Sequence, residues 1–452
     1  MSIHIVVKPD STPAKSNSVT SAGAHMFRFV SGLASAMLLC VLLTVSLAQE
    51  QQKDGRYYEG EARKAYEAKD YPLFLSNIKL AAELRPNHPR LIYNLAAAYA
   101  LNGQSKVALT WLNKLASMGL VFSPQADHDF DALKNEAKFS AIVGSFEKNH
   151  RPLVKSVKAF SVPEKGLVPE SVAYDPQTHT FYLSSVYKRK ILSVNKAGEI
   201  HDFSTMSDGL WSVMGMKVDR ERRVLWVTTT AHSQMSDFKT EDRGKSAILK
   251  YDLRTDRLVA RFEPLDSAKP HWFGDLAISS DGDVYASDSI NPAIYVIRHE
   301  TNKIEAFIEG GPFVSPQGLD FTADQKHLFL ADYSKGLFVI DVATRQVKSI
   351  AADFTLLGID GLYSYKGSLV AVQNGVNPQR LVRYFVSKNL DRVAHFEVLE
   401  ANNPIFDEIT LGVLVEKDFY FIANSQWGAI DKNGHLAPQD KLTDPTILKL
   451  RL

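Results

Sequence analysis

The spacing of apolar residues divides the chain into three parts. Residues 29–48 form the only long apolar run, diluted by Ser35, Thr44 and Ser46, and from about 57 to 148 apolar residues recur every three or four positions. From 155 to the C-terminus, short β-rich runs alternate with turn residues such as Asp, Gly and Asn. These patterns are typical of a targeting segment, of amphipathic helices and of β-strands, in that order. The sequence therefore predicts a mostly β protein with a small N-terminal helical domain.

The β-rich part is built from repeats. Six similar segments start these repeats, and their second residues are Glu170, Met214, Gly274, Gln317, Asp360 and Asp407. The spacings of 44, 60, 43, 43 and 47 residues match four-stranded propeller blades. The longest spacing contains a polar insertion at 231–246, which we expect to form a loop over one mouth of the ring. The sequence therefore predicts a six-bladed β-propeller over residues 155–452.

The sixth repeat is one strand short. It contains the β-rich runs 409–415 and 419–424 and the final run 446–452. A candidate for its missing strand lies upstream of the first repeat, at 157–162. A ring must hide both of its edges, and pairing the two ends of the chain does so. We therefore expect 157–162 to pair with the C-terminal strand.

The helical part, at 57–148, resembles the tetratricopeptide repeat family. Tyr66 and Tyr99 are 33 residues apart, close to the period of about 34 in that family. Pro86 and Gly103 stand where helices should end. Such arrays need about three repeats to fold alone, and fewer than two are clear here, so we expect the module to lean on the propeller or on a second copy. It is either a peptide-binding groove for a protein partner or a structural cap, and its shortness favours the cap.

The apolar run at 29–48 has the features of an export signal. Arg28 precedes it, and a small-x-small motif ends at Ala48. We expect residues 1–48 to be a leader and signal peptide, with Met26 as the true start and cleavage after Ala48, which places the mature protein in the periplasm or outside the cell. The alternative is an N-terminal membrane anchor, because the run is just long enough to span a bilayer. Cleavage would also remove Cys40, the only cysteine, and would exclude disulfides and a thiolate nucleophile.

Composition adds two exclusions. The chain has 452 residues, of which 45% are hydrophobic and 23% charged, with a formal net charge of +1. This is ordinary globular composition, and it gives no electrostatic reason to expect nucleic acid or, after signal cleavage, a membrane as a partner. The chain also lacks a Gly-rich phosphate loop, a G-x-S-x-G elbow and an H-E-x-x-H zinc motif.

The propeller repeats resemble the gluconolactonase and regucalcin-like family. The strongest match is Ser-Pro-Gln-Gly-Leu-Asp-Phe at 315–321, continued by Leu-Ala-Asp at 330–332 and Asp-Gly-Leu at 360–362. The resemblance implies that the first strands line a central tunnel, where a Glu, an Asn and an Asp hold one divalent cation, often Ca²⁺. In this chain the Glu matches Glu170, the Asp matches Asp360, and Gln317 replaces the Asn. Asp360 would also be the catalytic base toward water.

Four further residues are candidates for contacting a substrate. Asp275 and Asp407 stand at the starts of the third and sixth repeats, and Glu408 follows at the latter. Asn374 ends a second strand, and His271 precedes the third repeat, where it is either an acid–base group or a packed histidine. Asp, Asn and Gly are also common in turns without any ligand, so turn chemistry is the alternative for this whole set and for the metal positions.

Two functions from different classes follow. The first is an exported lactonase-like propeller, in which metal-assisted hydrolysis of a lactone or related ester takes place at the tunnel. The second is a non-catalytic scaffold that binds a small ligand or a protein. The pair Glu170 and Asp360 favours the enzyme, whereas Gln317 and the fused helical module favour the scaffold. The sequence leaves this choice open.

Overall fold

The computed structural model describes residues 54–266 and 268–452. The expected leader and signal peptide, at 1–48, lie outside the described residues. Asp54–Leu452 forms one compact unit that holds both the helical part and the β-rich part. Within the described ranges, no helix has both the length and the apolarity needed to cross a membrane.

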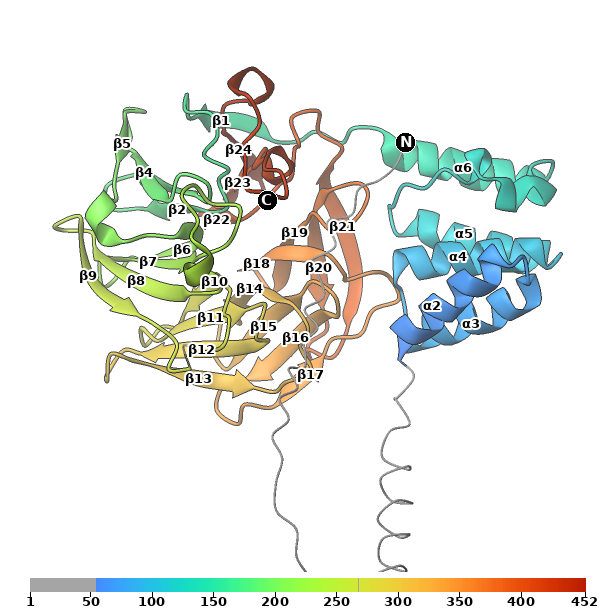
Figure 1. Ribbon diagram of the computed structural model, residues 1–452, viewed down its shortest axis with the longest axis horizontal. Helices are drawn as coiled ribbons and strands as arrows, with labels where there is room; N and C mark the ends of the chain where they lie inside the picture. The colour runs from blue at the N-terminus through green and yellow to red at the C-terminus, as the bar shows by residue number, and fades with distance from the viewer. Residues whose placement is uncertain (1–53, 267) are drawn as a thin grey trace, which may run out of the picture. The chain divides into compact units, whose positions relative to one another are not determined.

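Five α-helices open this unit (Figure 1). They are α2 (Gly55–Glu67), α3 (Tyr71–Leu84), α4 (Pro89–Leu101), α5 (Ser105–Ser117) and α6 (Ala137–His150). Asp54 and Asp70 begin the first two, since their side chains accept hydrogen bonds from the N–H groups of Tyr57 and Leu73 at 2.9 and 3.0 Å. Small and aliphatic side chains of α2, α3 and α4 share one apolar core. Helices are thus confirmed at 57–148, while their assignment as tetratricopeptide repeats stays a prediction.

Six four-stranded antiparallel sheets follow in the described part of the chain, as the repeat spacing predicts. Each of the first five sheets, or blades, consists of four strands that follow one another in the sequence. The first blade has β2 (Val172–Asp175), β3 (Thr180–Ser185), β4 (Lys190–Val194) and β5 (Ile200–Asp202), and the second has β6 (Ser212–Asp219), β7 (Val224–Thr230), β8 (Ser246–Asp252) and β9 (Arg257–Phe262). The third has β10 (Phe273–Ile278), β11 (Val284–Asp288), β12 (Ala293–Arg298) and β13 (Lys303–Glu309), the fourth has β14 (Pro316–Phe321), β15 (His327–Asp332), β16 (Gly336–Asp341) and β17 (Val347–Ser349), and the fifth has β18 (Ile359–Tyr365), β19 (Ser368–Gln373), β20 (Arg380–Val386) and β21 (Val393–Ala401). The sixth combines β22 (Gly412–Val415), β23 (Asp418–Ile422) and β24 (Thr446–Arg451) with β1 (Val157–Ser161).

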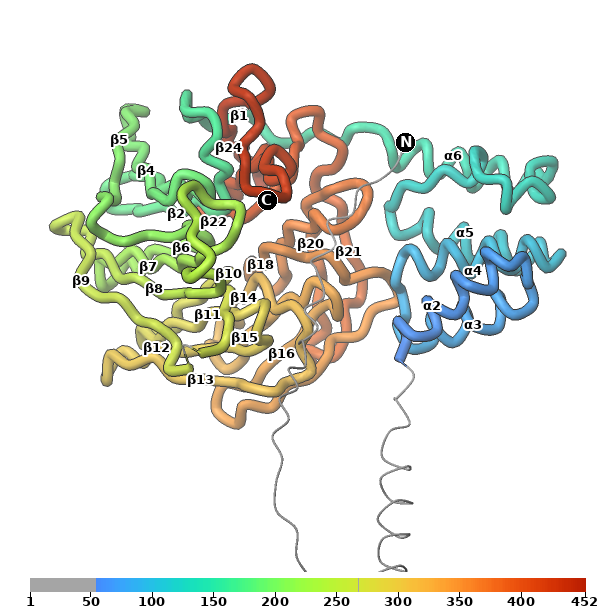
Figure 2. Tube along the Cα trace, viewed as in Figure 1, coloured from blue at the N-terminus to red at the C-terminus, as the bar shows by residue number. Residues whose placement is uncertain are grey.

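The ring closes as the sequence predicts. β1 pairs antiparallel with β24, with Val157 opposite Lys449 and Ser161 opposite Thr446. The two strands lie side by side in the trace of Figure 2, so the first strand of the β-rich part becomes the outer strand of the last blade. This pairing hides the strand edges that the two ends of the β-rich part would otherwise leave open.

Glycines let the innermost strands of neighbouring blades approach closely. A Cβ on Gly318 in β14 would lie 2.5 Å from the backbone nitrogen of Leu362 in β18. A Cβ on Gly215 in β6 would lie 2.6 Å from the carbonyl oxygen of Gly274 in β10. The register also shifts within all four of these strands, between the first residues and the remainder of the pairing. Each strand therefore bulges where it starts, near the middle of the ring (Figure 1).

The helices pack on the fifth blade, which consists of β18–β21. Val121 donates its N–H to the carbonyl of Asn377 at 2.8 Å, and Asn87 donates its side-chain amide to the carbonyl of Ala352 at 2.7 Å. Phe354 and Val376 of this blade pack against the core formed by α4, α5 and α6. The short helical array thus packs against the propeller, as expected for an array with too few repeats to fold alone.

Candidate functional site

The innermost strands bring three acidic side chains together at the centre of the ring. Glu170 lies just before β2, Asp360 lies in β18, and Glu408 lies before β22. Glu170 is only 7% exposed, and its pKa is raised well above the usual value by burial and then by the carboxylates of Asp360 and Glu408. Burial also raises the pKa of Glu408. We call Glu170, Asp360 and Glu408 the acidic cluster.

Neutral donors hold the acidic cluster in place. The indole N–H of Trp427 donates to Oε2 of Glu170 at 2.7 Å, and the N–H of Gly428 donates to Oε2 of Glu408 at the same distance. Both donors come from the loop between β23 and β24. Within the described ranges, neither Glu170 nor Glu408 forms a salt bridge. The negative charge of these carboxylates is therefore met by hydrogen bonds and not by a basic side chain.

Asn374, one of the predicted substrate contacts, is joined directly to the acidic cluster. Its side-chain amide donates to Oδ2 of Asp360 at 2.8 Å and to the carbonyl of Ile409 at 2.9 Å. The hydroxyl of Tyr333 donates to Oδ1 of Asn374 at 3.2 Å. Asn374 thus fixes the orientation of the Asp360 carboxylate, and Tyr333 fixes that of Asn374.

Gln317, the predicted third metal ligand, faces a neighbouring strand. Its side-chain amide donates to Oγ of Ser315 at 3.1 Å, and its Oε1 would lie 3.6 Å from a Cβ on Gly274. Neither of these two contacts of Gln317 involves Glu170 or Asp360. The structure therefore brings two of the three predicted ligands together, and the role of Gln317 stays a prediction.

Asp275 belongs to a second group of ionisable side chains, whose other members the sequence pattern did not single out. Asp275 in β10 is 3% exposed, and burial raises its pKa to about 6, while Lys217 in β6 opposes that shift. Lys217 also acts on Asp320 in β14, and its ammonium lies 4.7 Å from the ring centre of Tyr363 in β18. Lys217, Asp320 and Tyr363 each stand three residues after the second position of their repeat, so aligning the repeats at that position would have revealed them. We call Lys217, Asp275, Asp320 and Tyr363 the lysine cluster.

The other two predicted substrate contacts belong to neither cluster, although the charge of Asp407 contributes to the raised pKa of Glu408. Asp407 is exposed, and Glu408 next to it joins the acidic cluster instead. His271 is 1% exposed, with Nδ1 at 2.6 Å from Oδ2 of Asp288 and Nε2 at 2.9 Å from the carbonyl of Asp266. Burial alone would lower the pKa of His271, but these two acceptors outweigh it and raise the pKa. Both ring nitrogens are engaged, which indicates a packed imidazolium and leaves neither nitrogen for acid–base work in this conformation.

An aromatic stack adjoins the acidic cluster. The ring of His232, the second residue of the 231–246 insertion, stacks on Trp272 at 4.4 Å and on Trp427 at 5.7 Å between ring centres. Trp427 is the residue that donates to Glu170. The insertion therefore contacts the loop that holds the acidic cluster, in keeping with the expected loop over one mouth.

A metal centre made only of strong protein ligands is not evident. Among residues 54–266 and 268–452, no group of three or more His, Cys, Asp or Glu side chains is arranged to hold a metal. A cation between Glu170 and Asp360 would need amide, carbonyl or water oxygens as its further ligands. Oxygen donors of this kind suit a hard cation such as Ca²⁺.

Comparisons with known proteins return propellers at low similarity. No protein-family model matches the chain, and no curated protein matches it. A gluconolactonase from Xanthomonas campestris is 12% identical over 66% of this chain and 96% of its own, with a TM-score of 0.45. A PQQ-bound aldose sugar dehydrogenase from Streptomyces coelicolor is 14% identical over 66% of this chain and 99% of its own, with a TM-score of 0.44. A virginiamycin B lyase from Staphylococcus aureus is 14% identical over 67% of this chain and 100% of its own, also with a TM-score of 0.44.

At this level of similarity the activities of those proteins do not transfer to this chain. The strand pairing of the chain itself establishes the six-bladed ring.

Proposed function

We propose that the centre of the ring binds a divalent cation, with Ca²⁺ the first candidate, and that the chain is an exported lactonase-like hydrolase. The observation that carries this proposal is the acidic cluster, in which the carboxyl group of Glu170 is buried, accepts a hydrogen bond from the neutral indole of Trp427, and has its pKa raised by the charges of Asp360 and Glu408. Buried carboxylates repel each other unless a proton or a cation lies between them. A cation would relieve that repulsion.

The donor set fits such an ion. Trp427 occupies only one carboxylate oxygen of Glu170, Oε2, which leaves Oε1 for a cation. Asp360 and the side-chain carbonyl of Gln317 would complete the protein ligands that the sequence predicts. All three offer hard oxygen donors, which Ca²⁺ prefers over nitrogen or sulfur.

The residues around the acidic cluster suggest how hydrolysis would proceed. A bound divalent cation supplies Lewis acidity toward a lactone carbonyl and toward water. Asp360, oriented by Asn374, would accept the proton of the attacking water. Tyr333 and Ile409 hold Asn374 and so keep that carboxylate aimed. Trp427 and its stacking partner His232 would screen the site from bulk water.

Thermal unfolding tests the cation site directly. A cation bound only to the folded state must raise the Tm. We expect CaCl₂ to raise the Tm of the wild type, EDTA to reverse this, and Glu170→Gln and Asp360→Asn to abolish the shift. Asp407→Asn is the matched control, because Asp407 is an exposed carboxylate in the same segment as Glu408. Lactone hydrolysis should follow the same pattern, and a wild type with neither a Tm shift nor hydrolysis would refute the proposal.

The alternative, a non-catalytic scaffold, is favoured by a groove in the helical part. This groove of about 240 Å³ is lined by α3, α4 and α5, and its lining includes Tyr99 and Trp111 together with Lys79, Lys114 and Glu83. The two lysines outnumber the one glutamate, and with the aromatic side chains they suit an acidic peptide, which would make a protein the partner. Binding of an acidic peptide by the wild type, lost in Lys79→Ala with Lys114→Ala, would support this function, most clearly if no lactone is hydrolysed.

A further inference from the structure

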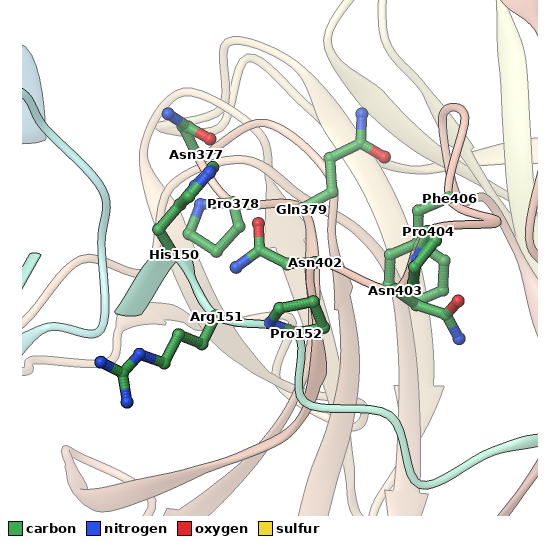
Figure 3. Close-up of a pocket in the computed structure, with 10 residues that line it drawn as sticks. All are labelled: His150, Arg151, Pro152, Asn377, Pro378, Gln379, Asn402, Asn403, Pro404 and Phe406. Atoms are coloured by element: carbon green, nitrogen blue, oxygen red, sulfur yellow. The ribbon is translucent and has the colours of Figure 1, made fainter. Parts of the chain in front are cut away.

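A cavity lies where the last helix meets the propeller, and Phe406 in its wall is two residues from Glu408 of the acidic cluster. It has a volume of about 530 Å³ and is lined by the linker after α6, by the loop between β19 and β20, and by the segment after β21 (Figure 3). Pro152, Pro378, Pro404 and Phe406 provide apolar wall. The space is sufficient for one or two sugar rings and too short for a long extended chain. We call it the junction cavity.

Four side-chain amides also line the junction cavity. In three of them, only one of the two polar atoms of the amide forms a hydrogen bond within residues 54–266 and 268–452 of the protein. Asn402 donates its amide N–H to the carbonyl of Asn149 at 2.8 Å, and Asn377 donates to the carbonyl of Val121 at 3.3 Å. Gln379 accepts the N–H of Ile409 at 3.1 Å through Oε1. In the described part of the chain, the opposite ends of these three amides, Oδ1, Oδ1 and Nε2, have no hydrogen-bond partner. The cavity therefore offers one acceptor on Asn402 and one donor group on Gln379, each on an amide held at its other end, and a further acceptor on the exposed side chain of Asn377.

The fourth amide is part of the support beneath the cavity. Asn403 donates to Oε1 of Glu400 at 2.6 Å, and Glu400 also accepts from the N–H and the hydroxyl of Ser156 at 2.8 and 2.6 Å. Glu400 is fully buried and satisfied by these donors. It ties the linker after α6 to the end of β21 and so makes the wall of the cavity rigid.

The charges around the junction cavity favour an uncharged occupant. No Asp or Glu lines it, His150 is its one titratable imidazole, and the guanidinium of Arg151 points away from Asn402 and Gln379 (Figure 3). Fixed amide acceptors and donors next to proline and phenylalanine faces suit a ligand whose hydroxyl groups donate and accept while its C–H faces pack on apolar wall. We propose that the junction cavity is a binding site for a neutral polyhydroxylated compound, a mono- or disaccharide. This site does not depend on the proposed hydrolase at the centre of the ring.

Ligand-observed NMR tests the proposal with glucose, maltose and inositol as probes. We expect saturation transfer to at least one of them with the wild type. Asn402→Gly should weaken that binding about tenfold, the ratio expected when roughly 1.4 kcal/mol of hydrogen bonding is lost. Glycine suits the left-handed backbone of Asn402, which has φ of 51°. Phe406→Leu, which keeps an apolar side chain but removes the ring face, should weaken binding by a second and independent route.

The matched control is Asn302→Gly. Asn302 is also an asparagine in the left-handed region, with φ of 53°, but it stands in an exposed turn of the third blade. This variant should bind like the wild type, and so should Glu170→Gln, which separates the junction cavity from the acidic cluster. Absence of binding for all three probes, equal binding in Asn402→Gly and Asn302→Gly, or binding of acetyl-alanyl-alanine amide in place of the sugars would overturn the proposal.

Discussion

At the residue scale, the ring encloses ionisable groups whose partners set their response to pH. His271 and Asp288 form a buried ion pair, and Asp288 also accepts the N–H of Trp272 at 3.0 Å. Because the folded state raises the pKa of His271 above its usual value of 6.5, folding favours the protonated imidazole. The stability that the pair contributes is therefore fully present below about pH 6.5 and is lost as the pH rises through the folded pKa.

His271→Asn should consequently destabilise the protein by about 2 kcal/mol at pH 6 and by less at pH 9. Urea unfolding at the two pH values measures the difference. His435→Asn is the control, because the pair of His435 with Asp431 is exposed and should contribute little. A cost for His271→Asn that is equal at both pH values would contradict the ion-pair assignment.

Asp275 shows the opposite consequence of burial, because burial raises the pKa of its carboxyl group and so favours the protonated form. Burial raises its pKa from 3.8 to about 6, so the native state loses stability as the pH rises between these values. Asp275→Asn should remove that loss and stabilise the protein above pH 6 by on the order of 2 kcal/mol, with little effect at pH 4. Thermal unfolding between pH 4 and pH 7 tests this prediction. As the control, Asp281→Asn changes an exposed carboxylate and should leave the Tm unchanged across that range.

At the element scale, the innermost strands depend on small residues where blades meet. Gly318→Ala would put a methyl group against the backbone of Asp360 and Leu362, at 2.6 Å from the carbonyl oxygen and 2.5 Å from the nitrogen. Neither backbone atom can move without opening the contact between two blades, so we expect a loss of about 3 kcal/mol. Gly60→Ala in α2 meets nothing within 4 Å and should stabilise by about 1 kcal/mol. Denaturant midpoints of the two variants should therefore shift in opposite directions.

The strands themselves could be predicted from the sequence, because the repeat spacing and the turn residues between strands are local features of the chain. The repeats indicated the six blades, and the unpaired run at 157–162 indicated the closure, since only one arrangement hides both edges. The bulges at the starts of β6, β10, β14 and β18 could not be read, because they arise from contacts between blades. The same reason applies to Lys217, which has meaning only once β6 lies beside β10 and β14.

The candidate site was predicted in part. Glu170 and Asp360 do come together, because they occupy equivalent positions at the starts of their repeats, and Asn374, at the end of a second strand, donates to Asp360. In the sixth repeat the prediction favoured Asp407, whereas Glu408 faces the cluster. Glu408 has a left-handed backbone with φ of 61°, and this local turn changes which side chain points inward. A backbone reversal of this kind has no signature in residue spacing.

At the scale of the whole molecule, one arginine joins the helices to the fifth blade. Arg380 in β20 is 1% exposed, and it donates to the carbonyl of Met118 at 2.7 Å and to Oε1 of Gln373 at 2.8 Å. A second contact reaches the carbonyl of Gly119 at 3.3 Å. A guanidinium enclosed in this way is stable only while all of its acceptors are present, because burial lowers its pKa.

Arg380→Met should therefore cost about 3 kcal/mol, since it leaves the carbonyls of Met118 and Gly119 without their donor and leaves Oε1 of Gln373 with only the hydroxyl of Tyr384. Because these groups span the helices and the propeller, the loss should also uncouple the two parts. We expect calorimetry to show one unfolding transition for the wild type and two for Arg380→Met, with the helices melting first because their array is too short to stand alone. Arg451→Met is the control, as Arg451 makes only an exposed pair with Asp418. A single transition shifted equally in both variants would mean that Arg380 does not couple the parts.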